Sequence, residues 1–454
     1  MRHILIIGAG KSTGVLVDYL LKKEEKEQFH ITLADKSVEA AQALVDGNDN
    51  AKAMELDIFN AKARTQIIKT ADIIISMLPA RFHIEVARDC VKLGKSMVTA
   101  SYVSPEMQEL DGPAKEKKLV LMNEIGVDPG IDHMSAKQVI DRIQNKGGKM
   151  ILFESFTGGL VAPEDDNNLW NYKFTWNPRN VVVAGQGGAA KFIQENKYKY
   201  IPYHRLFRRT EFLDVDGYGR FEAYANRNSL QYREIYGLDD IATLYRGTMR
   251  RVGYSKAWNM FVQLGMTDDS YVLDNSENMT YREFVNSFLP YSPTDSVELK
   301  MRHELKIDQD DIMWEKLMEL DLFNNQKTIG IKDASPAMAL QKILEDSWTL
   351  QKGEKDMIVM YHKFGYELDG EKKQIDSTMV CLGDGDRQTA MAKTVGLPVA
   401  MAALAILNGT IKTYGVQIPI SKEVYEPILS ELQEYGIRFR ESETPYLGYN
   451  ALNR

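Results

Sequence analysis

A short apolar strand that runs directly into a glycine turn limits what this chain can fold into. Residues 4–7 read Ile-Leu-Ile-Ile, and "GAGKSTG" follows at residues 8–14. The end of this turn matches a phosphate-binding P-loop, but a P-loop requires glycine where this chain has Leu5. The strand also leaves no room before Gly10 for a loop that wraps phosphates. The P-loop is therefore excluded, and the turn is that of a dinucleotide-binding fold.

The residues after the turn supply the other parts of a dinucleotide-binding unit. Such a unit needs a helix after the glycines and an acidic residue roughly 20 positions later, at the end of a second strand. Apolar residues at positions 15, 16, 19 and 20 share one helix face, and Asp35 ends the segment "HITLAD". Gly8 and Gly10 are expected to let the backbone approach the pyrophosphate. The residues expected to bind it in the first helical turn are Lys11, Ser12 and Thr13.

Short apolar strands alternate with helical segments beyond this point. Strands are predicted at 51–57, 72–79, 96–101 and 119–123, with a helix at 82–93. This alternation is typical of a Rossmann-type doubly wound parallel sheet, so the fold class is α/β. Ligands bind at the carboxyl ends of such strands, and we expect the loop at 123–134 to face the nicotinamide unless it only leads out of the domain.

The residue at the end of the second strand bears on the choice of cofactor. Asp35 is expected to bind the adenosine ribose hydroxyls, which favours NAD over NADP because a 2′-phosphate would meet a like charge. Lys36 and Ser37 could still receive that phosphate, so both cofactors remain open. Asp57, after the third strand, either approaches the adenine or caps the strand end.

The sequence predicts three parts. Residues 1–133 form the dinucleotide-binding domain, 134–394 an α+β substrate-binding and dimerisation domain, and 395–454 a C-terminal segment that returns to the first domain. The second part is expected to hold strands at 150–160, 180–185, 356–364 and 377–384 and helices at 310–323 and 336–348. The apolar segment 395–411 is expected to be a helix buried on several faces.

The composition excludes several classes of protein. Lys and Arg number 56 against 64 Asp and Glu, a net charge of −8, which argues against a nucleic-acid or membrane-surface partner. Two cysteines provide no disulfide framework, and none of the seven histidines has zinc-protease spacing, so no metal is expected. Without 18 uninterrupted apolar residues or a signal peptide, a soluble cytoplasmic protein is predicted. With no G-x-S-x-G nucleophile motif either, hydride transfer is left as the chemistry.

An arginine and tyrosine cluster at 224–254 marks the expected substrate site. Guanidinium groups bind carboxylates in a bidentate manner, so the cluster indicates a ligand with several carboxylates. Arg227 and Arg250 are predicted in tight loops that bind the ligand, whereas Arg233 and Arg251 are predicted on a solvated face with salt bridges. The candidate proton carriers near the strand ends are Tyr102, Asp128, His133 and His83.

Longer segments give a family resemblance over nearly the whole chain. They are "SMLPARFHIEVARDCVKLGKSMVTASYVSP", "NEIGVDPGIDHM", "FTGGLVAPEDDNNLWNYKFTWNPRNVV", "YANRNS", "LYRGTMRRVGY" and the region from "AKTVGLPVAMAALAILNGTIKTYGV" to "ELQEYGI". With "GAGKSTG", this order of segments resembles the saccharopine reductase family, also called saccharopine dehydrogenase (L-glutamate-forming). The resemblance implies that saccharopine is interconverted with α-aminoadipate δ-semialdehyde and glutamate by hydride transfer with a nicotinamide cofactor, as part of lysine metabolism.

The resemblance also implies roles for individual residues. Ser101, Tyr102 and Asp128 would line the substrate, with Tyr102 and Asp128 as the catalytic candidates. Arg227, Thr248 and Arg250 would hold substrate carboxylates. The residues implied to pack around the cofactor are Leu78, Val127, Pro129 and Trp176. A homodimer is expected. Family members that use NADP commonly carry a basic or small polar residue where this chain has Asp35, so the resemblance favours NADP and the residue favours NAD.

Other functions share this fold. Carboxynorspermidine dehydrogenase, lysine 6-dehydrogenase and homospermidine synthase act on amines or imines of similar length. A polyamine substrate would require carboxylates, which Glu164, Asp165 and Asp166 could supply. A protein that binds dinucleotide without turnover is the third hypothesis.

Overall fold

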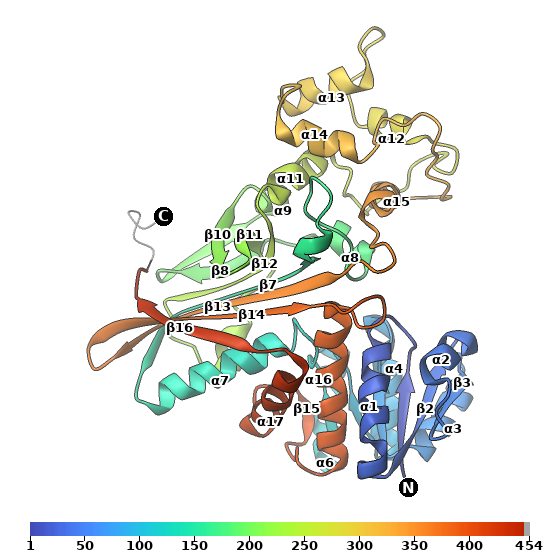
Figure 1. Cartoon of the computed structure of the whole chain (residues 1–454), viewed down its shortest axis with the longest axis vertical. Helices are drawn as coiled ribbons and strands as arrows, with labels where there is room; N and C mark the ends of the chain where they lie inside the picture. Colours follow the sequence, from blue (N-terminus) through green and yellow to red (C-terminus); the bar gives the residue numbers. More distant parts are fainter. Residues whose placement is uncertain (449–454) are drawn as a thin grey trace. The chain divides into compact units, whose positions relative to one another are not determined.

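The computed structural model describes residues 1–448 and divides into two compact units (Figure 1). Unit 1 comprises residues 1–149 and 379–440, and unit 2 comprises residues 150–378 and the described residues from 441 onward. The functions predicted for residues 1–133, 134–394 and 395–454 stay predictions, since this division reflects packing and not function.

Unit 1 is built on a seven-stranded sheet with the order β15-β6-β5-β4-β1-β2-β3. Every neighbouring pair is parallel, which confirms the predicted Rossmann-type α/β fold. The chain leaves β1 in one direction toward β2 and later returns to its other side at β4, the arrangement in which ligands bind at the carboxyl ends of the strands. The strands are β1 (Arg2–Ile7), β2 (Phe29–Asp35), β3 (Ala51–Glu55), β4 (Ile73–Ser76), β5 (Ser96–Val98), β6 (Val120–Met122) and β15 (Gly415–Gln417).

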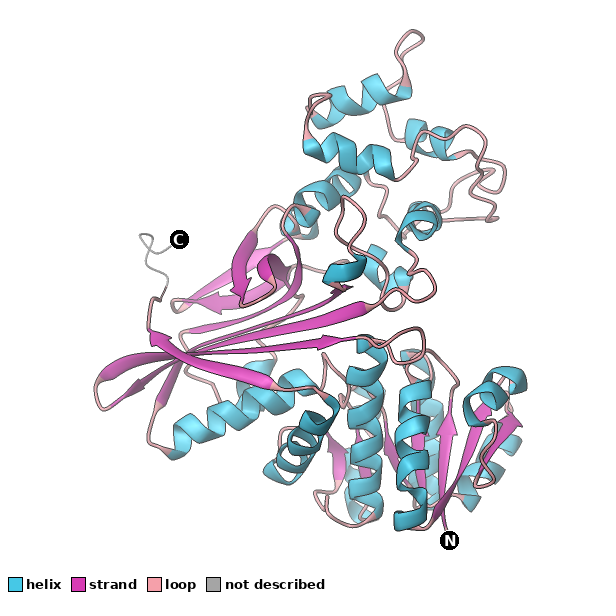
Figure 2. Ribbon diagram, viewed as in Figure 1, coloured by secondary structure: helices cyan, strands magenta, loops and turns pink. Residues whose placement is uncertain are grey.

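Helices cover both faces of this sheet, because its central strands are apolar on both sides (Figure 2). Residues 4–7 of β1, for example, are at most 1% exposed. The helices are α1 (Thr13–Glu27), α2 (Val38–Val45), α3 (Ala61–Thr70), α4 (His83–Leu93), α5 (Pro105–Gln108), α6 (Asp111–Glu116), α7 (Ile131–Asn145), α16 (Ala390–Leu407) and α17 (Lys422–Leu432).

The C-terminal part of unit 1 packs beside its N-terminal part, with α16 next to α1 (Figure 1). A Cβ at Gly396 would lie 2.7 Å from the carbonyl oxygen of Ser12, so only glycine permits this approach. The helix begins earlier than predicted because Thr389 caps it, its side chain accepting from the backbone N–H of Ala392. Among the described residues, α16 alone has the length and hydropathy of a membrane span, and 67% of it is buried, as in a core helix.

Unit 2 is built on a mixed sheet with the order β10-β11-β12-β7-β13-β14-β16, and the hairpin β8-β9 joins it through β12. Figure 2 draws its strands in magenta, like those of unit 1. The strands are β7 (Lys149–Val161), β8 (Ala190–Gln194), β9 (Lys197–Ile201), β10 (Thr210–Val215), β11 (Gly219–Ala225), β12 (Thr243–Arg251), β13 (Asp356–Leu368), β14 (Glu371–Leu382) and β16 (Phe439–Pro445).

Helices of unit 2 include the predicted segments near 310–323 and 336–348. The strand predicted at 180–185 is wrong, because Asn177 caps and Pro178 begins the short helix α8 there. The helices are α8 (Pro178–Val182), α9 (Tyr203–Leu206), α10 (Tyr232–Tyr236), α11 (Tyr254–Leu264), α12 (Tyr281–Ser287), α13 (Val297–Leu305), α14 (Ile312–Glu319) and α15 (Pro336–Trp348).

Candidate functional site

The glycine turn of unit 1 fits a dinucleotide pyrophosphate. Gly8 has a φ of +111°, and a Cβ there would lie 2.7 Å from the carbonyl oxygen of Met77, so glycine is required. A Cβ at Gly10 would meet nothing within 4 Å, which leaves the backbone of the turn open to a ligand. The Thr13 hydroxyl donates to the Gly8 carbonyl at 2.9 Å and holds the turn closed.

The structure corrects the position of the residues that follow. Helix α1 begins at Thr13, so Lys11 and Ser12 precede the helix and do not form its first turn. The reason is the hydrogen bond from the Thr13 N–H to the Gly10 carbonyl at 3.0 Å, which makes residues 10–13 a separate turn. Lys11 is exposed at this turn, where its ammonium can reach an anion.

The carboxylate of Asp35 is fixed beside the glycine turn. It ends β2, and its two oxygens accept from the backbone N–H of Ala9 at 2.7 Å and of Ser37 at 2.9 Å. The side chains of Lys36 and Ser37 are exposed next to it. Asp57 lies two residues beyond β3, is exposed, and accepts from the N–H of Phe59 at 3.0 Å, which is a turn-capping contact.

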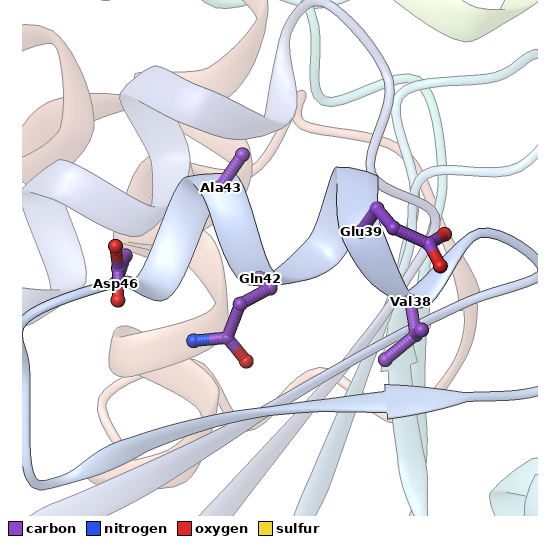
Figure 3. Close-up of a pocket in the computed structure, with 5 residues that line it drawn as sticks. All are labelled: Val38, Glu39, Gln42, Ala43 and Asp46. Atoms are coloured by element: carbon purple, nitrogen blue, oxygen red, sulfur yellow. The ribbon is translucent and has the colours of Figure 1, made fainter.

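A pocket near this region lies on the outer side of α2 (Figure 3). It is lined by Val38, Glu39, Gln42, Ala43 and Asp46, and its volume is about 450 Å³. None of the residues predicted for the site lines it, so it is separate from the glycine turn.

Two loops at the carboxyl edge of the sheet bring Ser101, Tyr102 and Asp128 together. The Tyr102 hydroxyl donates to a carboxylate oxygen of Asp128 at 3.4 Å. The loops are joined by a bond from the Glu124 N–H to the Ser101 carbonyl at 3.0 Å and by one from the Val103 N–H to the Glu124 carboxylate at 3.0 Å. These substrate candidates therefore share one rigid edge of unit 1.

The predicted cofactor-packing residues of unit 1 occupy the same edge. Val127 and Pro129 are buried in the loop that carries Asp128, and Leu78 is half-buried after β4. The buried His133 imidazole contacts the Glu124 carboxylate at 2.9 Å, so this candidate proton carrier also holds the loop in place.

His83 is the residue of this edge whose contacts the sequence did not indicate. Its Nδ1 lies 2.8 Å from the Ser76 hydroxyl and its Nε2 lies 2.8 Å from the Ser101 hydroxyl. Burial lowers the pKa of His83 to about 4, so the imidazole is neutral at neutral pH. The one sequence signal for these contacts is a histidine at the start of the helix that follows β4.

Arg250 is the central feature of unit 2. The residue is 3% exposed, and its guanidinium lies over three tyrosine rings, at 4.9 Å from Tyr172, 5.2 Å from Tyr254 and 5.9 Å from Tyr224. Its hydrogen bond to the Met249 carbonyl is 2.8 Å long, and no carboxylate of the described chain pairs with it. Burial opposes the charge, but the tyrosines hold the pKa of Arg250 above its ordinary value.

The prediction of a tight loop around Arg250 is wrong, because the residue lies inside strand β12. Within the strand, Gly247 is a glycine because there is no space for a side chain: a Cβ there would lie 2.9 Å from the Phe156 ring. Thr248 and Arg250 point to the same face of the sheet, since side chains alternate along a strand. Thr248 donates to the Asn226 side chain at 2.8 Å.

The other arginines of the cluster have different surroundings. Arg227 lies in a loop after β11, as predicted, and its exposed side chain has no ion pair in the described chain. The salt bridges predicted for Arg233 and Arg251 are absent from the described residues. Arg251 donates to the Tyr218 carbonyl at 2.6 Å, and Arg233 donates to the Tyr198 hydroxyl at 3.3 Å. Trp176, implied at the cofactor, is 39% exposed in the loop before α8.

Comparisons with known proteins cover both units. Family profiles described as "Saccharopine dehydrogenase NADP binding domain" and "Saccharopine dehydrogenase C-terminal domain" match residues 4–122 and 126–437. Saccharopine dehydrogenase (NADP(+), L-glutamate-forming) of Saccharomyces cerevisiae is 32% identical over 97% of this chain and 99% of its own. The mitochondrial alpha-aminoadipic semialdehyde synthase of Rattus norvegicus is 33% identical over 98% of this chain, which covers 48% of that relative.

Solved structures give the same picture. The apo saccharopine dehydrogenase (L-Glu forming) from Saccharomyces cerevisiae matches with a TM-score of 0.89 and 30% identity, over 98% of this chain and 100% of that one. A homospermidine synthase from Legionella pneumophila matches with a TM-score of 0.55 at 10% identity, over 98% of this chain and 92% of that one, which shows a shared fold alone.

Proposed function

Because this chain belongs to the saccharopine dehydrogenase family, we propose that it is an oxidoreductase of lysine metabolism acting on the CH–NH group of saccharopine. In the oxidative direction, saccharopine and water give glutamate and α-aminoadipate δ-semialdehyde, while a hydride passes to the nicotinamide and a proton is released. The single observation that carries this proposal is the buried Arg250 guanidinium, which lacks a carboxylate partner in the described chain.

Saccharopine can supply the carboxylate partner that Arg250 lacks within the described chain. Saccharopine carries three carboxylates, and a buried guanidinium is costly unless an anion and hydrogen bonds compensate it. We assign one carboxylate to Arg250 and to the Thr248 hydroxyl, which would turn from the Asn226 side chain to donate to it, and another to the exposed Arg227 guanidinium. The tyrosines around Arg250 exclude water from the first of these ion pairs, which strengthens it.

The cofactor is NAD(P), which supplies or accepts the hydride when bound. Gly8 and Gly10 let the backbone approach the pyrophosphate, and Lys11 and Ser12 contact it, while the buried Thr13 supports the turn through its bond to the Gly8 carbonyl. For the adenosine end we propose NAD(H), because the Asp35 carboxylate is fixed where a 2′-phosphate would be repelled. The names of the relatives favour NADP(H), for which Lys36 is the available cation.

Tyr102 and Asp128 are the proposed catalytic residues. Their contact at 3.4 Å aims a hydroxyl and a carboxylate at one point on the edge of the sheet, beside Ser101. There they can orient the secondary amine and hold or pass the proton that leaves it, directly or through a water molecule. Val127, Pro129, Leu78 and Trp176 are proposed as apolar neighbours of the cofactor.

The polyamine alternative is weakened by the acidic residues on which it depends. Glu164 pairs with the Lys355 ammonium at 3.5 Å, Asp165 accepts from the Lys355 N–H at 2.8 Å, and Asp166 accepts from the Asn171 amide at 3.1 Å. All three carboxylates already have partners within the chain, so none is left as an evident site for an ammonium group.

The test is a panel assay that follows nicotinamide absorbance with NAD and NADP against saccharopine, lysine and carboxynorspermidine. We expect turnover with saccharopine, and faster with NAD. Turnover with carboxynorspermidine alone would overturn the proposal, and cofactor binding without any turnover would support a non-catalytic protein. The homodimer and the cytoplasmic location remain proposals, checked by light scattering and by cell fractionation.

A further inference from the structure

Three hydroxyl groups surround a buried imidazole beside the proposed substrate residues. Ser76, at the end of β4, contacts the Nδ1 of His83 at 2.8 Å, and Ser101, after β5, contacts its Nε2 at 2.8 Å. The Thr99 hydroxyl lies 3.2 Å from Nε2 and 3.4 Å from Nδ1. Ser76 is 0% exposed, and its hydroxyl has His83 as its one side-chain partner in the described chain.

This imidazole is not suited to carry a charge. Burial is the cause of its lowered pKa, and the groups that face it from β4 and from the loop after β5 are uncharged hydroxyls. A neutral imidazole has one N–H donor and one acceptor nitrogen, and the two roles can be exchanged between Nδ1 and Nε2.

We propose that His83 is a positioning residue that lets the Ser101 hydroxyl act either as a donor or as an acceptor toward the substrate, without any change of charge. The inference rests on the proposed function in that Ser101 contacts saccharopine.

Each arrangement of the proton sets Ser101 differently. With the proton on Nδ1, the ring donates to Ser76, and Ser101 donates to Nε2, which leaves its oxygen to accept from the substrate. With the proton on Nε2, the ring donates to Ser101, whose own O–H is then directed to the substrate, while Ser76 rotates to donate to Nδ1. Ser76 can reverse its role because hydroxyl hydrogens rotate.

During the reaction the substrate first offers hydrogen-bond donors to Ser101 and later offers acceptors. A secondary amine or its ammonium form offers N–H donors, whereas the imine nitrogen and the aldehyde oxygen formed later are acceptors. A fixed donor or a fixed acceptor would suit one stage and leave an unpaired polar group at the other, which costs free energy in a buried site. The arrangement around His83 can serve both stages.

The test compares Ser76→Ala, His83→Phe and Ser101→Ala in the full-length enzyme, with Cys90→Ala as a control in the same helix α4. Ser101→Ala is expected to lower kcat/KM for saccharopine about fivefold to thirtyfold, the effect of one or two hydrogen bonds. Ser76→Ala is expected to lower it about twofold to fivefold although Ser76 cannot touch the substrate. In the Ser101→Ala background, neither Ser76→Ala nor His83→Phe should lower it further. Cys90→Ala should leave kcat/KM unchanged.

Two results would overturn the inference. One is Ser76→Ala with unchanged kcat/KM, or an effect that multiplies with that of Ser101→Ala. The other comes from ¹⁵N NMR of labelled histidine, which does not depend on turnover. We expect a neutral His83 ring from pH 6 to pH 9 whose protonated nitrogen differs between free and saccharopine-bound enzyme; a doubly protonated or unchanged ring contradicts this. Failure of the wild type to turn over saccharopine is a failure of the proposed function and is seen before any variant is compared.

Discussion

Replacing Arg250 by methionine tests the substrate site most directly. Methionine keeps the apolar stem of the side chain but lacks the guanidinium that lies over the tyrosine rings, so the charge and its hydrogen bonds are removed. A hydrogen bond to a charged group contributes about 1.5–3 kcal/mol, and each 1.4 kcal/mol is a factor of ten in affinity. We therefore expect the Kd for saccharopine to rise by roughly 10-fold to 150-fold.

The stability of Arg250→Met should not fall with its affinity. The guanidinium is buried without a carboxylate in the described chain, and its contacts with the tyrosine rings offset the cost of this burial, so its removal should leave the free energy of unfolding little changed. A residue needed for folding alone would instead destabilise the protein when replaced. The combination of a stable variant and a lost ligand identifies Arg250 as a ligand-binding residue.

The measurement is calorimetric titration with saccharopine, paired with thermal unfolding with and without the ligand. A ligand at 100 times its Kd stabilises the folded protein by about 2.7 kcal/mol, and this increment should disappear in Arg250→Met. Arg251→Met is the matched control, because Arg251 is the next residue of β12 and points to the other face of the sheet. Saccharopine affinity within threefold of the wild type in Arg250→Met, or an equal loss in Arg251→Met, would refute the assignment.

Three further outcomes are expected. Asp35→Ser should raise NADPH affinity about tenfold relative to NADH in fluorescence titrations, because a like charge is removed; an unchanged ratio would show that Asp35 does not select the cofactor. Gly8→Ala should abolish NADH binding, since its Cβ would lie 2.7 Å from the Met77 carbonyl; Gly47→Ala, with no atom within 4 Å, is the control for a left-handed glycine. His83 has a folded pKa of about 4, below its unfolded value of 6.5, so its stabilising effect is complete above pH 6.5 and is lost as the pH falls to 4. In denaturant titrations, the free energy of unfolding of the wild type should therefore fall by about 3 kcal/mol more than that of His83→Phe between pH 6.5 and pH 4. An equal fall in both proteins would show that the pKa of His83 is not lowered by burial.

The sequence predicts unit 1 well because its information is local. The strand before Gly8, the acidic end of β2 and the later apolar strands each follow from a few neighbouring residues, and parallel packing brings their carboxyl ends to one edge. Contacts between distant segments are not encoded in this way. The partners of His83 depend on how the loop after β5 meets the start of α4, and no spacing in the sequence reports that contact.

The errors in unit 2 have the same origin. "RGTMR" contains glycine and threonine, which are common in turns, but the segment pairs with β7 on one side and β11 on the other and therefore lies in a strand. "NVVVAG" is rich in β-branched residues, but the cap at Asn177 and the proline after it begin a helix. In both places residues outside the segment override its local preference.

The strand order of unit 1 bears on how the protein is made. β15 (Gly415–Gln417) completes one edge of the sheet beside β6, and α16 covers α1, yet both emerge from the ribosome only after residues 150–378 of unit 2. Until then the nascent first 149 residues have an unpaired β6 edge and an uncovered apolar face on α1. The sheet that carries the glycine turn can therefore be completed only after residues 150–378 have been translated.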